Sequence, residues 1–478
     1  MSQNNQSDKQ SSNDKNELIY GLNDRPEPLK ALFAAFQHIL ASFVGITTPA
    51  LIIGGVLGLG EHLPYLISMA LIVSGVGTFI QAKKVGPIGS GLLCVQGTSF
   101  AFLSAVLAAG FLVKNRGGSS EEILAMIFGV CLCSAFIEIV LSRFMHKLGR
   151  IITPVVTGIV ITTIGLSLIK VGMTDLAGGF NAEDKGALHY LAIGGITLST
   201  IIFLNRFSNQ TLRLSAIMIG MVVGYISAAF MGMVNFEIAE VALITIPTPF
   251  KYGLDFDIAA FIPVAIISVV TAIETTGDLT ANSMVSNEPV KGPIYMKRIK
   301  AGVLGDGTNS TIAAIMGSFP MSTFSQNNGV IQLTGVASRY VAFYIAGLFV
   351  LLGMFPIIGA FLQTMPKPVL GGATLVMFGT VAAAGIRILA TAELGRRDLL
   401  IMAVSFGLGL GVTAVPEVTN FLPPLLKSVM GSSVTVAGLS AILMSLFLPM
   451  GKGEAAKIAA AEKEAEKDAA QADAMEAS

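Results

Sequence analysis

The chain has 478 residues, of which 53% are hydrophobic and only 13% are charged, and its mean hydropathy is +0.74. Soluble domains carry roughly 25% charged residues, so this composition excludes a water-soluble globule. Lys plus Arg and Asp plus Glu number 30 each, which gives no basic excess for binding nucleic acid. We therefore expect an all-α polytopic membrane protein with no nucleic-acid partner.

Both ends of the chain are polar. Residues 1–27 are rich in Ser, Asn and Asp and lack the basic and apolar regions of a signal peptide. The segment 451–478 is rich in Ala, Glu and Lys without a sustained apolar stripe. We expect both to be solvated cytoplasmic tails, the second partly helical, in preference to a partner-binding helix.

Between the tails, apolar stretches suited to membrane helices, which need roughly 20 residues each, follow one another. They run approximately over 31–55, 64–82, 98–113, 121–142, 152–172, 188–205, 213–232, 258–280, 300–317, 328–335 running into 338–360, 368–391, 398–416 and 433–449. Counting two interrupted spans gives about 14 crossings. The excess of Lys and Arg in alternate loops places both termini in the cytoplasm.

Two intervals are polar at membrane depth. Gly86–Phe100 and Gly317–Gly329 are rich in Gly, Pro, Ser, Thr, Gln and Asn. Non-helical backbone at this depth must be buried in protein or line a cavity. These intervals therefore predict two broken helices.

A weak internal repeat accompanies the broken helices. PVVTGIVITTIG from Pro154 and PVLGGATLVMFG from Pro368 share the Pro-Val start and two glycines, Gly158 with Gly372 and Gly165 with Gly379. The partners lie an odd number of spans apart, which predicts inverted halves. Inverted repeats with paired broken helices are typical of secondary transporters. Helix packing alone would explain the glycines but not the polar interruptions.

Ionisable residues within the spans are functional candidates, because each costs roughly 2.5–3.5 kcal/mol to insert. Glu274 and Asp278 are spaced i,i+4 on one helix face, with Thr271, Thr275 and Asn282 on or beside it. Two carboxylates this close are not expected to be ionised together, so one is a candidate proton carrier. The alternative is a network of hydrogen bonds between packed helices.

Two more intramembrane groups stand apart from this pair. Asp306 lies between glycines in the next span, and His38 lies in the middle of the first span. Each is either a proton site or a buried packing residue. Glu138, near the end of its span, is expected to snorkel to the interface.

The amides Gln326, Asn327 and Asn328 stand at the second interruption, and Phe100 follows the first. Amides both donate and accept hydrogen bonds, which suits the edge of a neutral heterocycle, and Phe100 is either a stacking ring or a core aromatic. Carboxylates and amides without a midplane Lys or Arg suit oxopurines or oxopyrimidines better than an anion. No Walker lysine, catalytic triad or metal cluster is present in the sequence, so we expect transport driven by an ion gradient and no enzymatic activity.

QNNGVIQLTG at Gln326–Gly335 resembles the signature motif of the nucleobase/ascorbate transporter family. The likeness extends over nearly the whole chain, including GSGLLCVQGTSF, TAIETTGDLTA and YMKRIKAGVLGDG, and is strongest to the bacterial xanthine permeases of that family. It implies proton-coupled symport of xanthine across the bacterial inner membrane, with the proton as coupling ion and no cofactor. It also implies a homodimer embedded in the lipid bilayer.

The resemblance implies seven plus seven inverted spans divided into a core and a gate domain. On this sequence the core domain would comprise residues 28–150 and 251–360, and the gate domain residues 151–250 and 361–450. Short strands would lie near Val95–Thr98 and Ser322–Gln326.

The same resemblance implies roles for individual residues. Glu274 would hold the purine ring N–H groups and Gln326 the carbonyl edge. The remaining substrate contacts would be the backbones of Ser99 and Ser325, the stacking ring of Phe100, and Asn327 as a selectivity residue. The proton-coupling network would comprise Glu274, Asp306, Asp278 and His38.

Other functions remain open on the sequence. Ser99 stands where some xanthine transporters have Asn, which keeps urate as an alternative substrate. Uracil is a further alternative, although the pyrimidine branch usually has a His near Asp278. An anion transporter of the same fold would need a cationic residue at the helix ends, and a non-transporting scaffold would need no titratable pair at the midplane.

Overall fold

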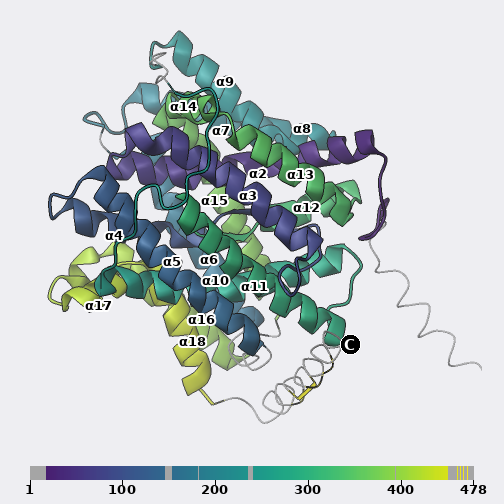
Figure 1. Ribbon diagram of the computed structural model, residues 1–478. Helices are drawn as coiled ribbons and strands as arrows, with labels where there is room; N and C mark the ends of the chain where they lie inside the picture. The colour runs from purple at the N-terminus through teal and green to yellow at the C-terminus, as the bar shows by residue number, and fades with distance from the viewer. Residues whose placement is uncertain are drawn as a thin grey trace, which may run out of the picture.

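The computed structural model describes residues 18–449 except 146–152, 181, 235–240 and 393, together with five isolated positions between 460 and 471. The first half of the chain contains the helices and strand α2 (Pro28–Leu57), η1 (Gly60–His62), α3 (Leu63–Lys83), β1 (Gln96–Thr98), η2 (Phe100–Phe102), α4 (Leu103–Lys114), α5 (Ser120–Phe144), α6 (Pro154–Leu176), α7 (Leu188–Asn205), α8 (Gln210–Leu214) and α9 (Ala216–Phe230). The second half contains α10 (Ile258–Val285), α11 (Pro293–Met316), β2 (Met321–Thr323), α12 (Ser325–Thr334), α13 (Arg339–Gly353), α14 (Pro356–Gln363), α15 (Lys367–Leu389), α16 (Arg396–Ala414), η4 (Pro416–Thr419), α17 (Pro424–Met430) and α18 (Ser433–Phe447). Figure 1 shows these helices packed side by side, and the expected all-α class is confirmed.

Eight helices in the described part of the chain are long and apolar enough to cross a membrane, and nine if the bent pair α13 and α14 is one span. Shorter apolar helices are Phe100–Lys114, Ala216–Phe230 and Ser433–Phe447. The protein is therefore a multi-pass membrane protein. The expected total of about 14 crossings stays a prediction, because several of those crossings rest on short or interrupted helices.

The two polar intervals contain the two short strands of the described residues. β1 and β2 pair antiparallel, with Gln96 opposite Thr323 and Thr98 opposite Met321. The pairing satisfies backbone groups that a membrane would leave without partners. Each strand leads directly into a short helix, η2 with α4 in one half and α12 in the other.

The strand expected near Val95–Thr98 is confirmed to within one residue. The strand expected over Ser322–Gln326 is wrong at its C-terminal end, because Ser325 and Gln326 begin α12. After Phe324, whose N–H still donates to the Val95 carbonyl, no partner strand continues the ladder. The backbone from Ser325 onward pairs within its own helix instead.

The repeat segments form α6 and α15, which pack against each other. A Cβ added to Gly165 would lie 2.3 Å from the backbone nitrogen of Ala382, and one added to Gly158 would lie 3.0 Å from the carbonyl oxygen of Gly385. Small residues allow this close approach of two membrane helices. Gly379, the repeat partner of Gly165, has no neighbour within 4 Å of such an atom, so the matched glycines are not equivalent in packing.

The helices form two sets by packing. The first set consists of α2, α3, α5, α10, α11 and α13. The second set consists of α6, α7, α9, α15, α16 and α18. Two helices of the first set, α2 and α10, also contact helices of the second set. These sets follow the residue ranges expected for core and gate domains, and their role as domains stays a prediction. The domain boundary at 150/151 and most of the tail 451–478 lie outside the described residues.

The described end of the N-terminal segment is held on the protein. Tyr20 forms a parallel bridge with Val336, and the backbone N–H of Arg339 donates to the carbonyl of Leu22. Ser338 also donates to the carbonyl of Asp24. The segment expected to be a solvated tail is therefore docked from about residue 18 onward, beside the C-terminal end of α12.

Candidate functional site

The polar stripe expected on α10 faces the interior of the protein. Thr271, Thr275, Asp278 and Asn282 are all buried. Glu274 is half-buried, and its Oε2 is buried and has no hydrogen-bond partner among the described residues. The i,i+4 spacing read from the sequence therefore places both carboxylates on a protein-facing side of the helix.

Asp306 is the centre of a hydrogen-bond network that joins four segments. Its Oδ1 accepts from Gln81 Nε2 and from Gln96 Nε2, each at 2.8 Å. Its Oδ2 accepts from the hydroxyl of Thr275 on α10. Asp306 is 1% exposed, and three donors to one carboxylate offset part of the cost of burying it.

Asp278 belongs to a second network, at the strand pair. Its Oδ2 accepts from the Thr323 hydroxyl at 3.1 Å. One turn further along α10, Asn282 Nδ2 donates to Asn328 Oδ1 at 2.8 Å and to the Leu93 carbonyl at 2.8 Å. Asn328 in turn donates to the Asp278 carbonyl. These contacts fix α10 to both broken helices.

The amides at the start of α12 have different surroundings. Ser325 and Gln326 are half-buried, whereas Asn327 is 1% exposed. Asn327 Nδ2 lies 2.9 Å from His38 Nδ1 on α2. His38, itself 0% exposed, therefore contacts the signature motif directly, while its Nε2 has no partner among the described residues.

The first broken helix brings Ser99 and Phe100 to the same region. The N–H of Ser99 donates to the Pro320 carbonyl at 2.9 Å, which extends the strand pairing. The ring of Phe100 meets that of Phe378 on α15 edge to face, with centroids 5.3 Å apart. Phe100 thus lies where the two helix sets meet, since Phe378 belongs to the second set.

Several buried polar atoms around this junction have no hydrogen-bond partner among the described residues. They include Glu274 Oε2, Ser99 Oγ, Thr98 Oγ1 and Asn327 Oδ1. Because buried polar groups are normally paired, this group of atoms is suited to a polar ligand or to water. The set combines acceptors and hydroxyls and contains no Lys or Arg, so it fits a neutral heterocycle with both donors and acceptors.

Sequence reasoning missed Gln81 and undervalued Gln96. Gln81 lies in the last turn of α3. Its side chain also donates to the Gly302 carbonyl and accepts from the N–H of Ser90. A lone amide inside an apolar run was the available signal. Gln96 lies within the polar interval Gly86–Phe100 and donates to Asp306.

The expectation that Glu138 snorkels to the interface is wrong. Glu138 is 1% exposed, and its Oε1 accepts from the Thr271 hydroxyl on α10. The helices α5, α10 and α11 pack together around it, so its side chain faces protein rather than lipid headgroups. The position of Glu138 on the α5 surface, not its nearness to the helix end, decides this.

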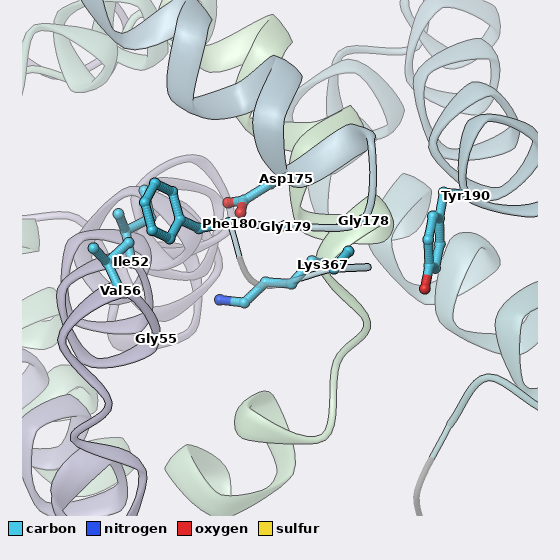
Figure 2. Close-up of a pocket in the computed structure, with 10 residues that line it drawn as sticks. Ile52, Gly55, Val56, Asp175, Gly178, Gly179, Phe180, Tyr190 and Lys367 are labelled. Carbon is cyan, nitrogen blue, oxygen red and sulfur yellow. The ribbon is translucent and has the colours of Figure 1, made fainter. Parts of the chain in front are cut away.

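A separate pocket lies between α2, the end of α6 and the start of α15. It has a volume of about 280 Å³ and is lined by residues including Val56, Asp175, Phe180 and Lys367. Figure 2 shows the Lys367 amine reaching toward α2, where an atom added at Gly55 would lie 2.6 Å from it. Asp175, 7% exposed, has one carboxylate oxygen without a hydrogen-bond partner among the described residues.

The described residues contain no group of three or more His, Cys, Asp or Glu side chains that is placed to hold a metal ion. The ion pairs of the described residues, for example Arg116 with Asp257 and Arg298 with Glu288, do not include Glu274, Asp278 or Asp306. The chemistry on offer at the junction is therefore hydrogen bonding and proton binding by carboxylates.

Comparison with known proteins gives consistent matches. A family model described as "Permease family" matches residues 29–418. Xanthine permease XanP of Escherichia coli strain K12 is 47% identical over 442 residues, which cover 91% of this chain and 96% of XanP. XanQ of the same organism is 46% identical over 440 residues, covering 91% and 94%. A xanthine permease of Bacillus subtilis strain 168 is 34% identical over 421 residues, covering 87% and 93%.

Solved structures share the fold at much lower identity. The transmembrane domain of the cyanobacterial bicarbonate transporter BicA aligns with a TM-score of 0.55 and 14% identity, covering 86% of this chain and 99% of that domain. The murine Slc26a9 anion transporter in its inward-facing state aligns with a TM-score of 0.61 and 11% identity, covering 89% and 69%. These likenesses concern the fold alone.

Proposed function

This chain belongs to the permease family of nucleobase/ascorbate transporters, and from that premise we propose that it carries xanthine, an oxopurine, into the cell in symport with protons. The proposal places the protein in a bacterial inner membrane as a homodimer with both termini in the cytoplasm, and without a cofactor. The named relatives carry the substrate assignment. The observation in the structure that carries the mechanism is the buried Oε2 of Glu274, which lies between two broken helices and has no hydrogen-bond partner in the described part of the chain.

The donor and acceptor pattern of the junction matches an oxopurine. A carboxylate at Glu274 accepts hydrogen bonds from ring N–H groups, and the amide of Gln326 pairs with a carbonyl edge. Ser99 and Ser325 would flank the ligand through their backbones, and Phe100 would stack on it. Asn327, held by His38, would tune selectivity at the N-terminal end of α12.

Proton coupling is assigned to the carboxylates of α10 and α11. Glu274 and Asp278 are one turn apart on α10, and Thr275 between them donates to Asp306. The ion pairs found in the described part of the chain include none of these three carboxylates. Carboxylates sharing a low-dielectric site do not all ionise at once, so loading a proton alters how they hold a ligand. One proton moved through 100 mV supplies about 2.3 kcal/mol, which is sufficient to drive accumulation.

Transport of an anion is the competing function suggested by the fold. An anion site needs positive charge, whereas the start of α12 offers Ser325, Gln326 and Asn327. The N-terminus of a helix favours an anion, but the carboxylate of Glu274 opposes one. Urate remains the competing substrate, because Ser99 offers only a hydroxyl where an amide would restrict the ligand more.

The test is uptake of radiolabelled xanthine into cells that lack their own purine permeases. We expect uptake that a protonophore abolishes, that unlabelled uracil competes with weakly, and that Glu274→Gln reduces at least 100-fold. Glu417→Gln, at an exposed position, is the matched control and should transport like the wild type. Uptake that survives both the protonophore and Glu274→Gln would contradict proton symport through this site, and strong urate transport without xanthine transport would overturn the substrate.

A further inference from the structure

One buried carboxyl group is not used by the mechanism above. Glu138 comes from α5, a helix on which the sequence marked no functional residue. Its Oε1 accepts a hydrogen bond from Thr271, and its Oε2 is buried without a hydrogen-bond partner among the described residues. An ionised carboxylate with half of its acceptor capacity unpaired is costly to bury.

Glu138 and Asp306 each meet a threonine hydroxyl of α10. Thr271 and Thr275 are one turn apart on α10, and each donates its hydroxyl hydrogen to a carboxylate, Thr271 to Glu138 and Thr275 to Asp306. The next residue after Asp306, Gly307, packs on the backbone of α5: an added Cβ would lie 2.9 Å from the Ile139 nitrogen and 3.1 Å from Glu138 Cβ. The two carboxyl groups therefore occupy one interface among α5, α10 and α11.

The charged groups around Glu138 are all acidic in the described part of the chain. α11 contributes Asp306, whose neighbour Gly307 packs against Glu138, and α10 contributes Glu274, three residues after Thr271, the hydroxyl donor to Glu138. On α4, the third helix packed on α5, the amine of Lys114 is bonded to the carbonyl of Leu57 instead. On α5 itself the exposed Arg143 is more than one turn away.

From this geometry we propose that Glu138 and Asp306 form a pair that shares one proton, so that Glu138 is a proton-carrying residue of the transport cycle. The proposal rests on the proton symport proposed above. The proton moves between carboxylate oxygens of the pair, so only O–H bonds break and form. When Asp306 is protonated, Glu138 can ionise, held by the Thr271 hydroxyl, and the reverse holds when Asp306 ionises.

The sign of the effect follows from the pairing. Replacing Glu138 by a neutral amide removes a negative charge from the interface that it shares with Asp306. Asp306 then loses its proton more readily. Uptake that depends on a protonated Asp306 then falls off at lower pH. For Glu138→Gln we expect the alkaline half-point of xanthine uptake to move down by about one pH unit, and proton-driven accumulation to fall more than tenfold while exchange of xanthine persists.

The experiment compares wild type, Glu138→Gln, Glu138→Asp and Thr271→Val for uptake from pH 5 to 9, and for exchange of preloaded xanthine. Glu138→Asp retains a carboxyl group and should restore the wild-type half-point. Thr271→Val should shift it by a smaller amount. Glu121→Gln, at an exposed position on the same helix, is the control and should leave the profile unchanged.

The outcomes separate this inference from the proposed function. If the wild type shows no protonophore-sensitive xanthine uptake, the proposed function fails. If it does, and Glu138→Gln keeps the wild-type half-point and accumulation, Glu138 is a permanently neutral packing residue and this inference is overturned. Should Glu138→Gln fail to reach the membrane, Thr271→Val decides, and a wild-type half-point in that variant would overturn the pairing.

Discussion

At the scale of residues, the site depends on amides that orient carboxylates. Gln81 uses its Nε2 for Asp306 and the Gly302 carbonyl, and its Oε1 for the N–H of Ser90. It therefore joins α3, the segment after it and α11. A carboxylate fixed by amides keeps one orientation without a positive charge, which leaves it free to bind a proton.

We predict that Gln81→Leu damages the site and the fold together. The leucine leaves the N–H of Ser90 without its partner and removes one of the two amide donors to Asp306 Oδ1, and an unsatisfied buried group costs about 1–3 kcal/mol. Xanthine uptake should drop at least tenfold, and the purified protein should melt several degrees lower. The measurements are uptake and thermal unfolding in detergent.

Gln363 provides the matched control for this change. It is an exposed amide with one hydrogen bond, to the Gly60 carbonyl. Gln363→Leu should alter uptake less than twofold. Equal losses in the two variants would show that the amide of Gln81 has no special role at Asp306.

At the scale of elements, the two halves differ in how closely their helices approach. The repeat in the sequence pairs Gly165 with Gly379, yet only Gly165 has another backbone against it. Gly385, which is not part of the repeat, is as crowded as Gly165, since an added Cβ would lie 2.3 Å from the Thr162 nitrogen. The contact between α6 and α15 therefore depends on glycines from both helices but not on the repeat itself.

We predict that Gly165→Ala destabilises the protein whereas Gly379→Ala does not. An added methyl group at Gly165 meets the Ala382 backbone, and such overpacking costs about 1–3 kcal/mol. At Gly379 it meets open space, and alanine is the better helix former by up to about 1 kcal/mol.

Thermal unfolding of the two variants measures the difference, and surface expression serves as a second readout. Gly165→Ala should melt lower than the wild type, and Gly379→Ala should melt at the same temperature or slightly higher. Equal melting temperatures would contradict the close contact of α6 with α15.

At the scale of the whole molecule, Lys367 connects the two helix sets. It begins α15, and its amine lies against Gly55 of α2, across the pocket from Asp175 of α6 (Figure 2). A contact between the sets must change if transport moves one set against the other. The charge of Lys367 is thus placed to favour one arrangement of the two sets.

We predict that Lys367→Met lowers the maximal rate of uptake several-fold with little change in the concentration for half-maximal uptake. The change removes the positive charge that lies across the pocket from Asp175 and the amine contact with Gly55 of α2. Concentration series of labelled xanthine provide the measurement.

Lys427→Met, at an exposed position, is the charge-matched control for Lys367→Met and should behave as the wild type. A change in half-saturation instead of rate would place Lys367 in substrate binding. Unchanged kinetics in both variants would remove the contact between Lys367 and α2 from the transport cycle.

Much of the candidate site can be proposed from the sequence because its residues break local rules. Glu274 and Asp278 stand out by their charge in an apolar helix, and Gln326 and Asn327 stand out in a polar interruption. Unfavourable residues at membrane depth are visible in any single sequence. Their partners are not, because Gln81 and Asp306 are 225 positions apart and only the packing of α3 on α11 joins them.

The amino-acid sequence by itself determined that the chain spans a membrane repeatedly, where its two helices break, and to which family it belongs. These properties follow from composition, hydropathy and a contiguous motif, which are local quantities. Only the tertiary structure decided that Glu138 faces the interior, that Gly165 and Gly379 differ, and that residues from 18 onward dock beside α12. Each of these depends on which surface of one helix meets another, and that choice is made by long-range packing among many apolar helices whose sequences look alike.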